Sequence, residues 1–555
     1  MPKNRISQDL RNQGRRRFLE TAVLGGAATV VLPVLAGART LEASPPAAGT
    51  ASFDLDEATI ADLQAGMASG KYTARSIAEK YLMRVDAVDK SGPAVNSIIE
   101  LNPDALSIAD QLDQERKQKG VRGPMHGIPI LIKDNIDTAD RMMTTAGSLG
   151  LVGPPARKDS FVAQKLREAG AVILGKTNLS EWANIRSSHS TSGWSGRGGL
   201  TRNPYALDRN PCGSSSGSGA AIAANLCAVA VGTETDGSVV CPASANGLVG
   251  IKPTLGLLSR VGIIPIAHSQ DTPGPMTRTV RDAAVLLSAL AGVDPRDSAT
   301  AASSGKAHAD YTRFLDPNGL RGARIGIARK YFGFNDEVDS LMNAAINDMK
   351  AQGAQIIDPA DLPSHGKFDD TELTVLLYEL KADLNAYLAG RPNAPVHSLD
   401  DVITFNDQNK DKEMPWFGQD LFIKAQSKGP LTSKEYLDAL AADQRLSRSE
   451  GIDAIMDKFN LDAIMAPTAS PAWLTDLANG DHAAGGSSNA AAVAGYPDIT
   501  VPAGFAFGLP VGVSFFGRAW SEPTLFRIAY AYEQATKARK PPQFVASTVE
   551  IKAKS

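Results

Sequence analysis

Two neighbouring segments decide how this 555-residue chain is interpreted: CGSSSGSGA at residues 212–220 and GTETDGSVV at residues 232–240. Both are rich in glycine and serine, yet residues 220–230 are apolar and carry no charged side chain. A flexible linker would not contain such a stretch, which suits a buried helix and a buried strand. The glycines therefore indicate tight backbone geometry inside an ordered domain.

Around these segments, helical and strand-like patterns alternate along the chain. The expected elements are helices from Thr73, from Asn102-Pro103 to Gly120, near 161–169 and from Thr279 to Gly292, and strands at 128–132, 171–174 and 324–328. Such alternation predicts an α/β fold, with helices on both faces of a central β-sheet. A more polar segment, about 360–450, is interpreted as a helical insertion or cap.

The composition is typical of a globular protein. Hydrophobic residues make up 43% of the chain, and 57 basic and 60 acidic side chains give a net charge of −3. This excludes disorder as the main state, and the charge balance gives no sign of a nucleic-acid partner. The three cysteines are too few for a disulfide-stapled scaffold and form no C-x-x-C pair. Cys212 and Cys241 are expected to be reduced and to act as small buried hydrophobic residues.

The first 38 residues have the order of a secretory signal: a basic stretch of net charge +4, an apolar run at 21–35, and Ala36-Gly37-Ala38 as a cleavage site. The segment RRRFL at 15–19 resembles the twin-arginine export signal, although Glu20 stands where that motif often has lysine. The apolar run is shorter than the ~20 residues that span a bilayer. An uncleaved membrane anchor is the alternative.

We therefore expect a signal peptide at 1–38, a linker at 39–52, a catalytic domain at 53–545 and a tail at 546–555. Cleavage would leave a mature chain with a net charge near −7. The expected partner is the twin-arginine export machinery. The mature protein is expected in the periplasm or outside the cell, and not in a membrane.

Several common catalytic motifs are missing from the sequence. None of the seven histidines belongs to an H-E-x-x-H pair, and there is no phosphate-binding G-x-x-x-x-G-K-[ST] loop. No metal and no cofactor are expected. Residues 213–217 do match the G-x-S-x-G motif, which would make Ser215 the nucleophile of an α/β-hydrolase. That motif requires a strand directly before it, whereas this sequence predicts a loop there.

Three separated elements without histidine provide a better candidate site. The first, GIPILIKDN at 127–135, places Lys133 directly after an apolar strand. Burial would lower the pKa of Lys133, and a neutral amine could act as a base; a surface lysine is the alternative. The other two are the quoted segments, in which Ser238 follows Ser214 by 24 residues. The turn before Ser238 can aim backbone N–H groups at an oxyanion, unless it is an ordinary capping turn.

Together the three elements resemble the amidase signature family over nearly the whole mature chain. GYPDITVP at 495–502 and GLPVGV at 508–513 look like the closing strands of that family. RNPY at 202–205 and GRAWSEP at 517–523 look closest to its bacterial peptide amidase branch. The resemblance implies one large α/β domain built on a mixed central sheet.

The resemblance also implies a catalytic Ser–cis-Ser–Lys triad. Ser238 would be the nucleophile, Ser214 the bridging serine at a cis peptide bond, and Lys133 the terminal base. Ser215 would support the site by hydrogen bonding. The oxyanion would be held by four backbone N–H groups, those of Thr235, Asp236, Gly237 and Ser238.

Three positions depart from the family pattern. Many members have Asp, Gly and Arg where this chain has Glu234, Asp236 and Val240. An aspartate beside an oxyanion would oppose its charge unless the carboxylate points away. The missing arginine removes a possible partner for Glu234.

The resemblance thus predicts an exported enzyme that hydrolyses carboxylic amides to an acid and ammonia or an amine. C-terminally amidated peptides are the favoured substrate, and small aliphatic or aryl amides, or esters, are the alternative. Two rival interpretations are a non-catalytic binding protein that retains the fold and a component of an amidotransferase. The triad argues against the first, and the export signal argues against the second.

Overall fold

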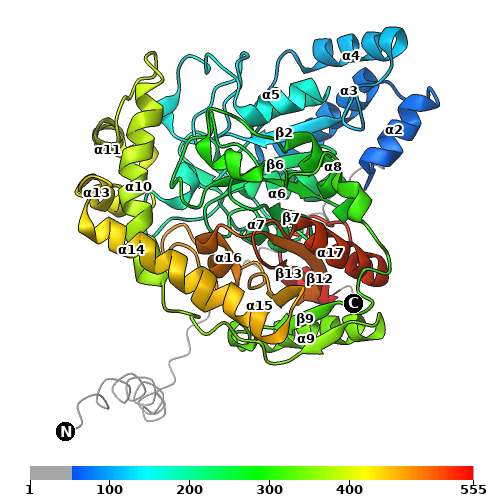
Figure 1. Ribbon diagram of the computed structural model, residues 1–555. Coiled ribbons are helices and arrows are strands. Elements are labelled where there is room, and N and C mark those ends of the chain that lie inside the picture. Colours follow the sequence, from blue (N-terminus) through cyan, green and yellow to red (C-terminus); the bar gives the residue numbers. More distant parts are fainter. Residues whose placement is uncertain (1–52, 554–555) are drawn as a thin grey trace, which may run out of the picture. The chain divides into compact units, whose positions relative to one another are not determined.

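The structure is a computed structural model that describes residues 53–553, so the expected signal peptide and linker lie outside the described residues. Within them, eleven strands form one mixed sheet in the order β1-β3-β2-β6-β8-β7-β12-β13-β11-β9-β10 (Figure 1). β2 is parallel to both β3 and β6, whereas β8, β7, β12 and β13 are joined by antiparallel pairs. The expected α/β fold with a mixed central sheet is confirmed.

The strands of the sheet are β1 (Ile98–Leu101), β2 (Pro129–Lys133), β3 (Val172–Thr177), β6 (Val229–Glu234), β7 (Val249–Lys252), β8 (Thr272–Thr277), β9 (Arg324–Ile327), β10 (Gln355–Ile357), β11 (Ala463–Pro467), β12 (Asp498–Ala506) and β13 (Leu509–Phe516). A separate small hairpin consists of β4 (Trp194–Ser195) and β5 (Gly199–Leu200).

The helices outside the segment 360–450 are α2 (Ile60–Ala68), α3 (Ala74–Arg84), α4 (Ala105–Lys119), α5 (Phe161–Glu168), α6 (Ser216–Ala223), α7 (Val240–Ala245), α8 (Val280–Leu290), α9 (Asp336–Ala351), α15 (Asp453–Phe459), α16 (Ser488–Ala494), α17 (Glu522–Thr536) and α18 (Thr548–Ala553).

Two crossovers place helices on opposite faces of the sheet. The chain leaves β2 through α5 to reach β3 on one side, and leaves β3 through α6 to reach β6 on the other side. Because both crossovers are expected to be right-handed, α5 and α6 cover opposite faces. α8 packs against α5 and α17, and α7 packs against α6, so both faces are covered.

The expected elements are confirmed, with ends that differ by up to three residues; β3, for example, extends to Thr177. Thr73 and Thr279 cap α3 and α8, because their side chains accept hydrogen bonds from the N–H groups of Ser76 and Asp282. The helix expected from Asn102-Pro103 instead begins at Ala105. The Asn102 side chain joins this helix start to the sheet, because its Oδ1 accepts from the Asp104 N–H at 2.9 Å and its amide nitrogen donates to the Ile173 carbonyl of β3 at 2.8 Å.

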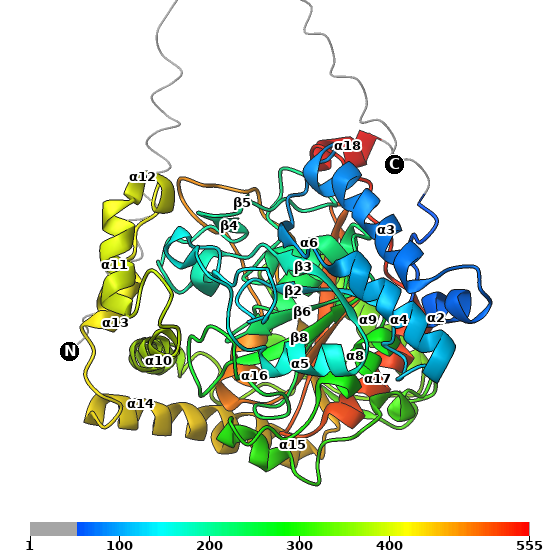
Figure 2. The same cartoon turned by 90° about the horizontal axis from the view of Figure 1, so that it is seen from above.

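Five helices of segment 360–450 lie together at one side of the sheet (Figures 1 and 2). They are α10 (Asp369–Ala389), α11 (Leu399–Gln408), α12 (Lys410–Glu413), α13 (Asp420–Gln426) and α14 (Lys434–Gln444). Trp182 and Leu179 from the central domain belong to the same apolar cluster as α10, α11 and α13. Arg186, fully buried, pairs with Glu181 and also donates to the Glu413 carbonyl, which ties α12 to the domain.

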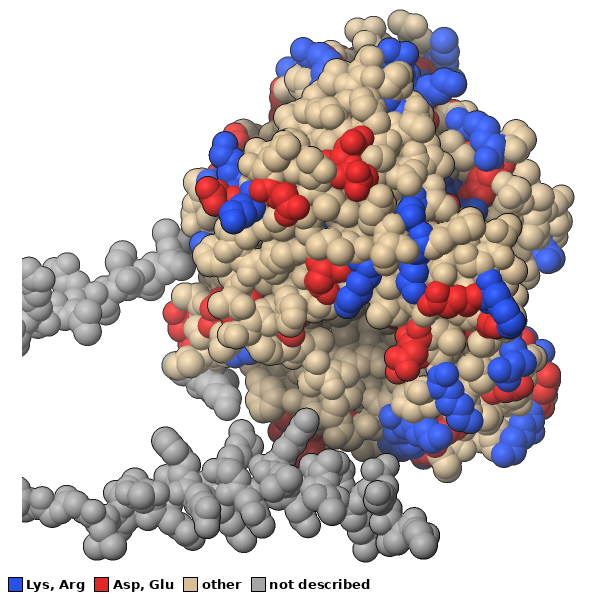
Figure 3. Space-filling view, turned by 90° about the vertical axis from the view of Figure 1, so that its left-hand side faces the viewer, with Lys and Arg blue, Asp and Glu red and all other residues tan. Residues whose placement is uncertain are grey.

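The surface on the side of α10, α11, α13 and α14 carries acidic and basic side chains that are interspersed rather than gathered by sign, and it is hollowed between them (Figure 3). Among residues 53–553, no helix has both the length and the apolar character that crossing a membrane requires.

The expected state of two cysteines is wrong. Cys212 and Cys241 form a disulfide, with their Cα atoms 6.0 Å apart, and only Cys227 is a free, buried thiol. The low cysteine count gave no hint of this pair, because their proximity depends on how α6 and α7 pack together.

Candidate active site

Lys133 and Ser214 meet at the carboxyl end of β2. Lys133 is the last residue of that strand and is fully buried, as is Ser214 in the loop that leads into α6. The Lys133 Nζ lies 2.7 Å from the Ser214 Oγ, although the two residues are 81 positions apart. The Gly213–Ser214 peptide bond is cis, the geometry that the family resemblance implies.

Thr233, on the neighbouring strand β6, holds the Lys133 amine from a second side. The Lys133 Nζ lies 2.9 Å from the Thr233 Oγ1 and 3.3 Å from its carbonyl oxygen. The Asn135 side chain also donates to this Oγ1, at 2.9 Å. We did not single out Thr233 from the sequence, although it stands in the third motif. The signal was available, because β2 and β6 were both expected as buried strands that precede polar turns.

The pKa of the Lys133 amine suits a base. Burial lowers it from its ordinary value to about 7, against the opposing effect of the carboxylates of Asp271 and Glu234. A neutral amine has two N–H groups and one lone pair. Two oxygens of Thr233 can accept the N–H groups, so the lone pair is left for the Ser214 hydroxyl.

Ser215 lies in a supporting position. Its hydroxyl donates to the Thr233 carbonyl at 3.1 Å and accepts from the Thr233 N–H at 3.2 Å. It is fully buried, and no strand precedes it directly in the described structure. The geometry that the G-x-S-x-G motif requires is therefore absent at residues 213–217.

A glycine in the first turn of α6 allows close packing around the site. A Cβ atom on Gly217 would lie 2.3 Å from the Ser97 carbonyl oxygen and 2.4 Å from that of Asn178. Both are backbone atoms and cannot move away as a flexible side chain would. The glycine content of this motif therefore reflects close backbone approach, as the sequence predicted.

Ser238 lies in the turn between β6 and α7, and 8% of its surface is exposed. Its carbonyl accepts a hydrogen bond from the Ser215 N–H at 3.2 Å, which places the turn beside the second motif. Within residues 53–553, however, the Ser238 hydroxyl makes no hydrogen bond. The structure thus joins Lys133 to Ser214 and leaves the link from Ser214 to Ser238 open.

The expected set of oxyanion donors needs one correction. The Gly237 N–H donates to the Glu234 Oε1 at 2.9 Å, so it is not free to bind an oxyanion. In the described chain, the N–H groups of Thr235, Asp236 and Ser238 have no acceptor. Three of the four expected donors therefore remain available.

Glu234 has partners despite the missing arginine. Its Oε2 accepts from the N–H groups of Val239 and Val240, at 2.8 and 3.1 Å, in addition to the bond from Gly237. Burial raises the pKa of Glu234, and the nearby Lys252 ammonium acts in the opposite direction. The carboxylate thus fixes the turn that carries Ser238.

The Asp236 carboxylate has its own partner outside the turn. Its Oδ1 accepts a hydrogen bond of 2.6 Å from the Ser488 hydroxyl at the start of α16. Burial raises the pKa of Asp236 to about 6, so the negative charge beside the oxyanion donors is weakened in mildly acidic solution.

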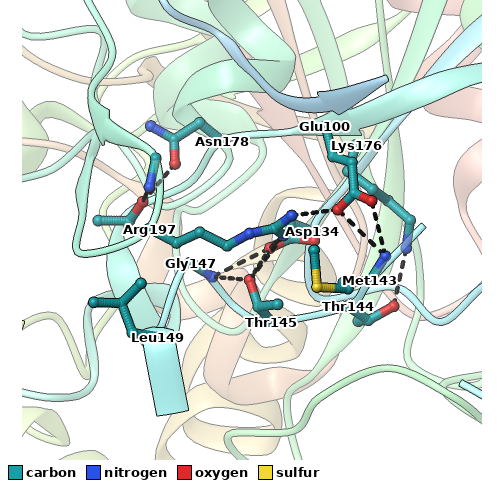
Figure 4. Close-up of polar contacts among 12 residues, drawn as sticks. Glu100, Asp134, Met143, Thr144, Thr145, Gly147, Leu149, Lys176, Asn178 and Arg197 are labelled. Atoms are coloured by element: carbon teal, nitrogen blue, oxygen red, sulfur yellow. Dashed lines mark hydrogen bonds and ion pairs between the residues drawn. The ribbon is translucent and has the colours of Figure 1, made fainter. Parts of the chain in front are cut away.

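A polar network holds the chain directly after Lys133 (Figure 4). The buried Asp134 carboxylate accepts from the Thr145 hydroxyl, from the Gly147 N–H at 3.3 Å and from Arg197 at 3.5 Å. Arg197 in turn pairs with Glu100. The backbone that positions the Lys133 amine is therefore anchored on several sides.

A cavity of about 540 Å³ opens beside both serine motifs. Its wall includes Gly213 and Gly237, the neighbours of Ser214 and Ser238, and Asp369 at the start of α10. Aromatic and polar residues also line the cavity, among them Tyr331, His365, Trp473, Asp481 and Asn489. Helix α10 therefore borders a cavity that reaches the chain neighbours of Ser214 and Ser238.

Comparisons with known proteins find relatives that match most of the chain. The model of the family described as amidase matches residues 76–526. A protein of Arabidopsis thaliana named "Probable amidase" is 43% identical over 507 residues, which are 90% of this chain and 93% of that protein. The native peptide amidase of Stenotrophomonas maltophilia has a solved structure that is 51% identical, with a TM-score of 0.85. The similarity covers 89% of this chain and all of that one.

A further relative has a different printed role. It is a glutamyl-tRNA(Gln) amidotransferase component of Alkalilimnicola ehrlichii, 34% identical over 502 residues, which are 88% of this chain and 99% of that protein.

Proposed function

Because this chain belongs to the amidase family and is an amide-hydrolysing enzyme, we propose that it removes the terminal amide group of C-terminally amidated peptides through an acyl-enzyme on Ser238. The observation that carries the mechanism is the 2.7 Å contact between the Lys133 Nζ and the Ser214 Oγ at a buried strand end. A buried, neutral amine beside a hydroxyl is the arrangement that activates a serine without histidine.

Acylation begins when the Ser214 hydroxyl gives its proton to Lys133 and takes the proton of Ser238. The Ser238 Oγ then attacks the amide carbonyl carbon, and the free N–H groups of Thr235, Asp236 and Ser238 stabilise the resulting oxyanion. The proton returns from Lys133 through Ser214 to the leaving nitrogen. The C–N bond breaks, ammonia leaves, and the acyl group stays on Ser238.

The same groups serve the second half of the reaction. Water takes the place of ammonia, and the relay from Ser214 to Lys133 accepts its proton as its oxygen attacks the acyl carbon. The proton then returns to Ser238 as the carboxylic acid forms. Because the Ser238 hydroxyl makes no hydrogen bond in the described structure, its link to Ser214 has to form when substrate binds.

Two observations support a peptide substrate over a small amide. The cavity of about 540 Å³ exceeds the space that acetamide or benzamide requires and lies within the range of ligand pockets. In addition, the protein whose structure is 51% identical is a peptide amidase. A glutamyl-tRNA amidotransferase role would instead need a tRNA-linked substrate and further protein partners.

Ammonia release from three substrates tests this choice. We expect kcat/KM for an amidated peptide to exceed that for acetamide and benzamide by roughly tenfold or more, since each additional buried group contributes ~1 kcal/mol or more. The same peptide with a free carboxylate serves as the blank for background ammonia. Equal values, or higher values for the small amides, would show that the enzyme is a general amidase.

We also propose that the protein is exported by the twin-arginine route, which the motif at residues 15–19 supports. The Cys212–Cys241 disulfide adds independent support, because such bonds persist mainly in oxidising compartments. In bacterial cells that express the full chain, we expect amidase activity in the periplasmic fraction. Replacing both Arg15 and Arg16 with lysine should retain the activity inside the cell, whereas Arg5→Lys should not. An unchanged distribution in the double variant would contradict the proposed route.

A further inference from the structure

The disulfide joins the two segments that must cooperate in the proposed reaction. Cys212 stands two residues before Ser214, and Cys241 stands three residues after Ser238. Both cysteines line the cavity beside the serines, and Cys212 is only 5% exposed. The covalent link therefore lies in the wall of the candidate active site and not at a distant surface.

Each cysteine is also tied to the backbone of its own motif. The Cys212 N–H donates to the Asn210 side chain at 2.8 Å, and the Ser216 hydroxyl donates to the Cys212 carbonyl at 2.6 Å. On the other side, the Cys241 N–H donates to the Gly237 carbonyl at 2.8 Å. A displacement of Cys212 would therefore move the loop that carries Ser214, and a displacement of Cys241 would move the turn that carries Ser238.

Other connections between these two segments are few. Within the described chain, a single hydrogen bond joins residues 212–215 to residues 235–241, from the Ser215 N–H to the Ser238 carbonyl at 3.2 Å. The reaction, however, needs the Ser214 and Ser238 hydroxyls within hydrogen-bond reach, and a misplacement of 1 Å can cost about 10²-fold in rate.

From this arrangement, and resting on the proposed function, we propose that Cys212 and Cys241 are positioning residues. Their disulfide keeps the Ser214 and Ser238 hydroxyls close enough for proton transfer. The enzyme is then fast when the pair is oxidised and slow when it is reduced. Reduction by a dithiol such as dithiothreitol breaks the S–S bond, and two thiols form with two electrons and two protons. The dithiol is oxidised to its cyclic disulfide in the same exchange.

The double variant Cys212→Ser/Cys241→Ser tests this directly, because serine keeps the size of the side chains and removes only the link. We expect kcat for the amide substrate to fall tenfold to about 10²-fold while KM stays within twofold. The measurement is made well below the melting temperature of both proteins, where both are fully folded. A merely structural disulfide would lower the melting temperature and leave kcat unchanged.

Three controls complete the experiment. Cys227→Ser changes a buried thiol that has no disulfide and should keep the kcat of the wild type. Dithiothreitol should lower the kcat of the wild type as two new thiols appear, reversibly on reoxidation, and should not affect the double variant. If the double variant does not fold, the effect of dithiothreitol on the kcat of the wild type still tests the positioning role.

The outcomes separate this inference from the proposed function. Wild-type kcat in the double variant, or unchanged kcat after the two thiols have formed in the wild type, would overturn the positioning role alone. A wild-type protein that releases ammonia from none of the amides would overturn the proposed function.

Discussion

Replacing Ser238 with alanine is expected to lower kcat by about 10⁴-fold or more, because the variant has no oxygen that can form the acyl-enzyme. The fold should persist, since the Ser238 hydroxyl makes no hydrogen bond in residues 53–553 and only its backbone carbonyl is used. Ammonia release in the steady state and thermal unfolding measured on the same preparation test both statements.

Ser244→Ala is the matched control for this substitution. Ser244 lies on α7, six positions after Ser238, and its hydroxyl accepts a hydrogen bond from the Gly512 N–H at 2.8 Å. We expect this variant to lose some stability and to keep its kcat. If Ser238→Ala retained a tenth of the wild-type kcat, another nucleophile would have to be sought.

The sequence predicted the elements that carry the motifs, whereas the family resemblance implied that the motifs form one site. Lys133 follows five apolar residues, 128–132, so a buried strand and a buried amine were expected. Residues 220–230 were apolar between two polar turns, which predicted α6 and β6. The structure adds that β2 and β6 are parallel neighbours, so their carboxyl ends lie at one edge of the sheet and the polar turns lie close together.

The sequence did not reveal contacts that depend on side-chain direction or on packing between helices. The disulfide needs Cys212 and Cys241 within bonding distance, which a sequence separation of 29 does not predict. The Gly237 N–H was expected to donate to an oxyanion, but it donates instead to the Glu234 carboxylate, three residues earlier in the chain. A carboxylate that satisfies three backbone N–H groups also explains how this chain dispenses with the arginine common at position 240.

Lys133 and its surroundings connect the fold to the chemistry. Burying a lysine as an ammonium ion costs free energy. In this site no described carboxylate contacts the Lys133 amine, and burial favours its neutral form. Asp271 and Glu234 limit the effect of burial, so the pKa remains about 7 and does not fall further. A base of this pKa is matched to work near neutral pH.

Replacing Lys133 with methionine should therefore lower kcat/KM by roughly 10²–10⁴-fold, the contribution typical of a general base. Methionine is of similar length, but it leaves the buried Ser214 hydroxyl without the hydrogen bond from Lys133, so the melting temperature should fall modestly while the fold persists. In the wild type, kcat/KM should increase with pH through about 7 and level off above about 8, because only the unprotonated amine can accept a proton. This rising limb should be missing from the residual activity of the variant.

Lys133→Arg separates the role of a base from that of a positive charge. A guanidinium keeps its proton at every accessible pH, so this variant should be as inactive as Lys133→Met if a neutral base is needed. If Lys133→Arg kept most of the activity, the side chain would act through its charge on the oxyanion or the substrate. If Lys133→Met kept the rising limb near pH 7, another group would be titrating; Asp236, with its pKa of about 6, would be the first to replace by asparagine.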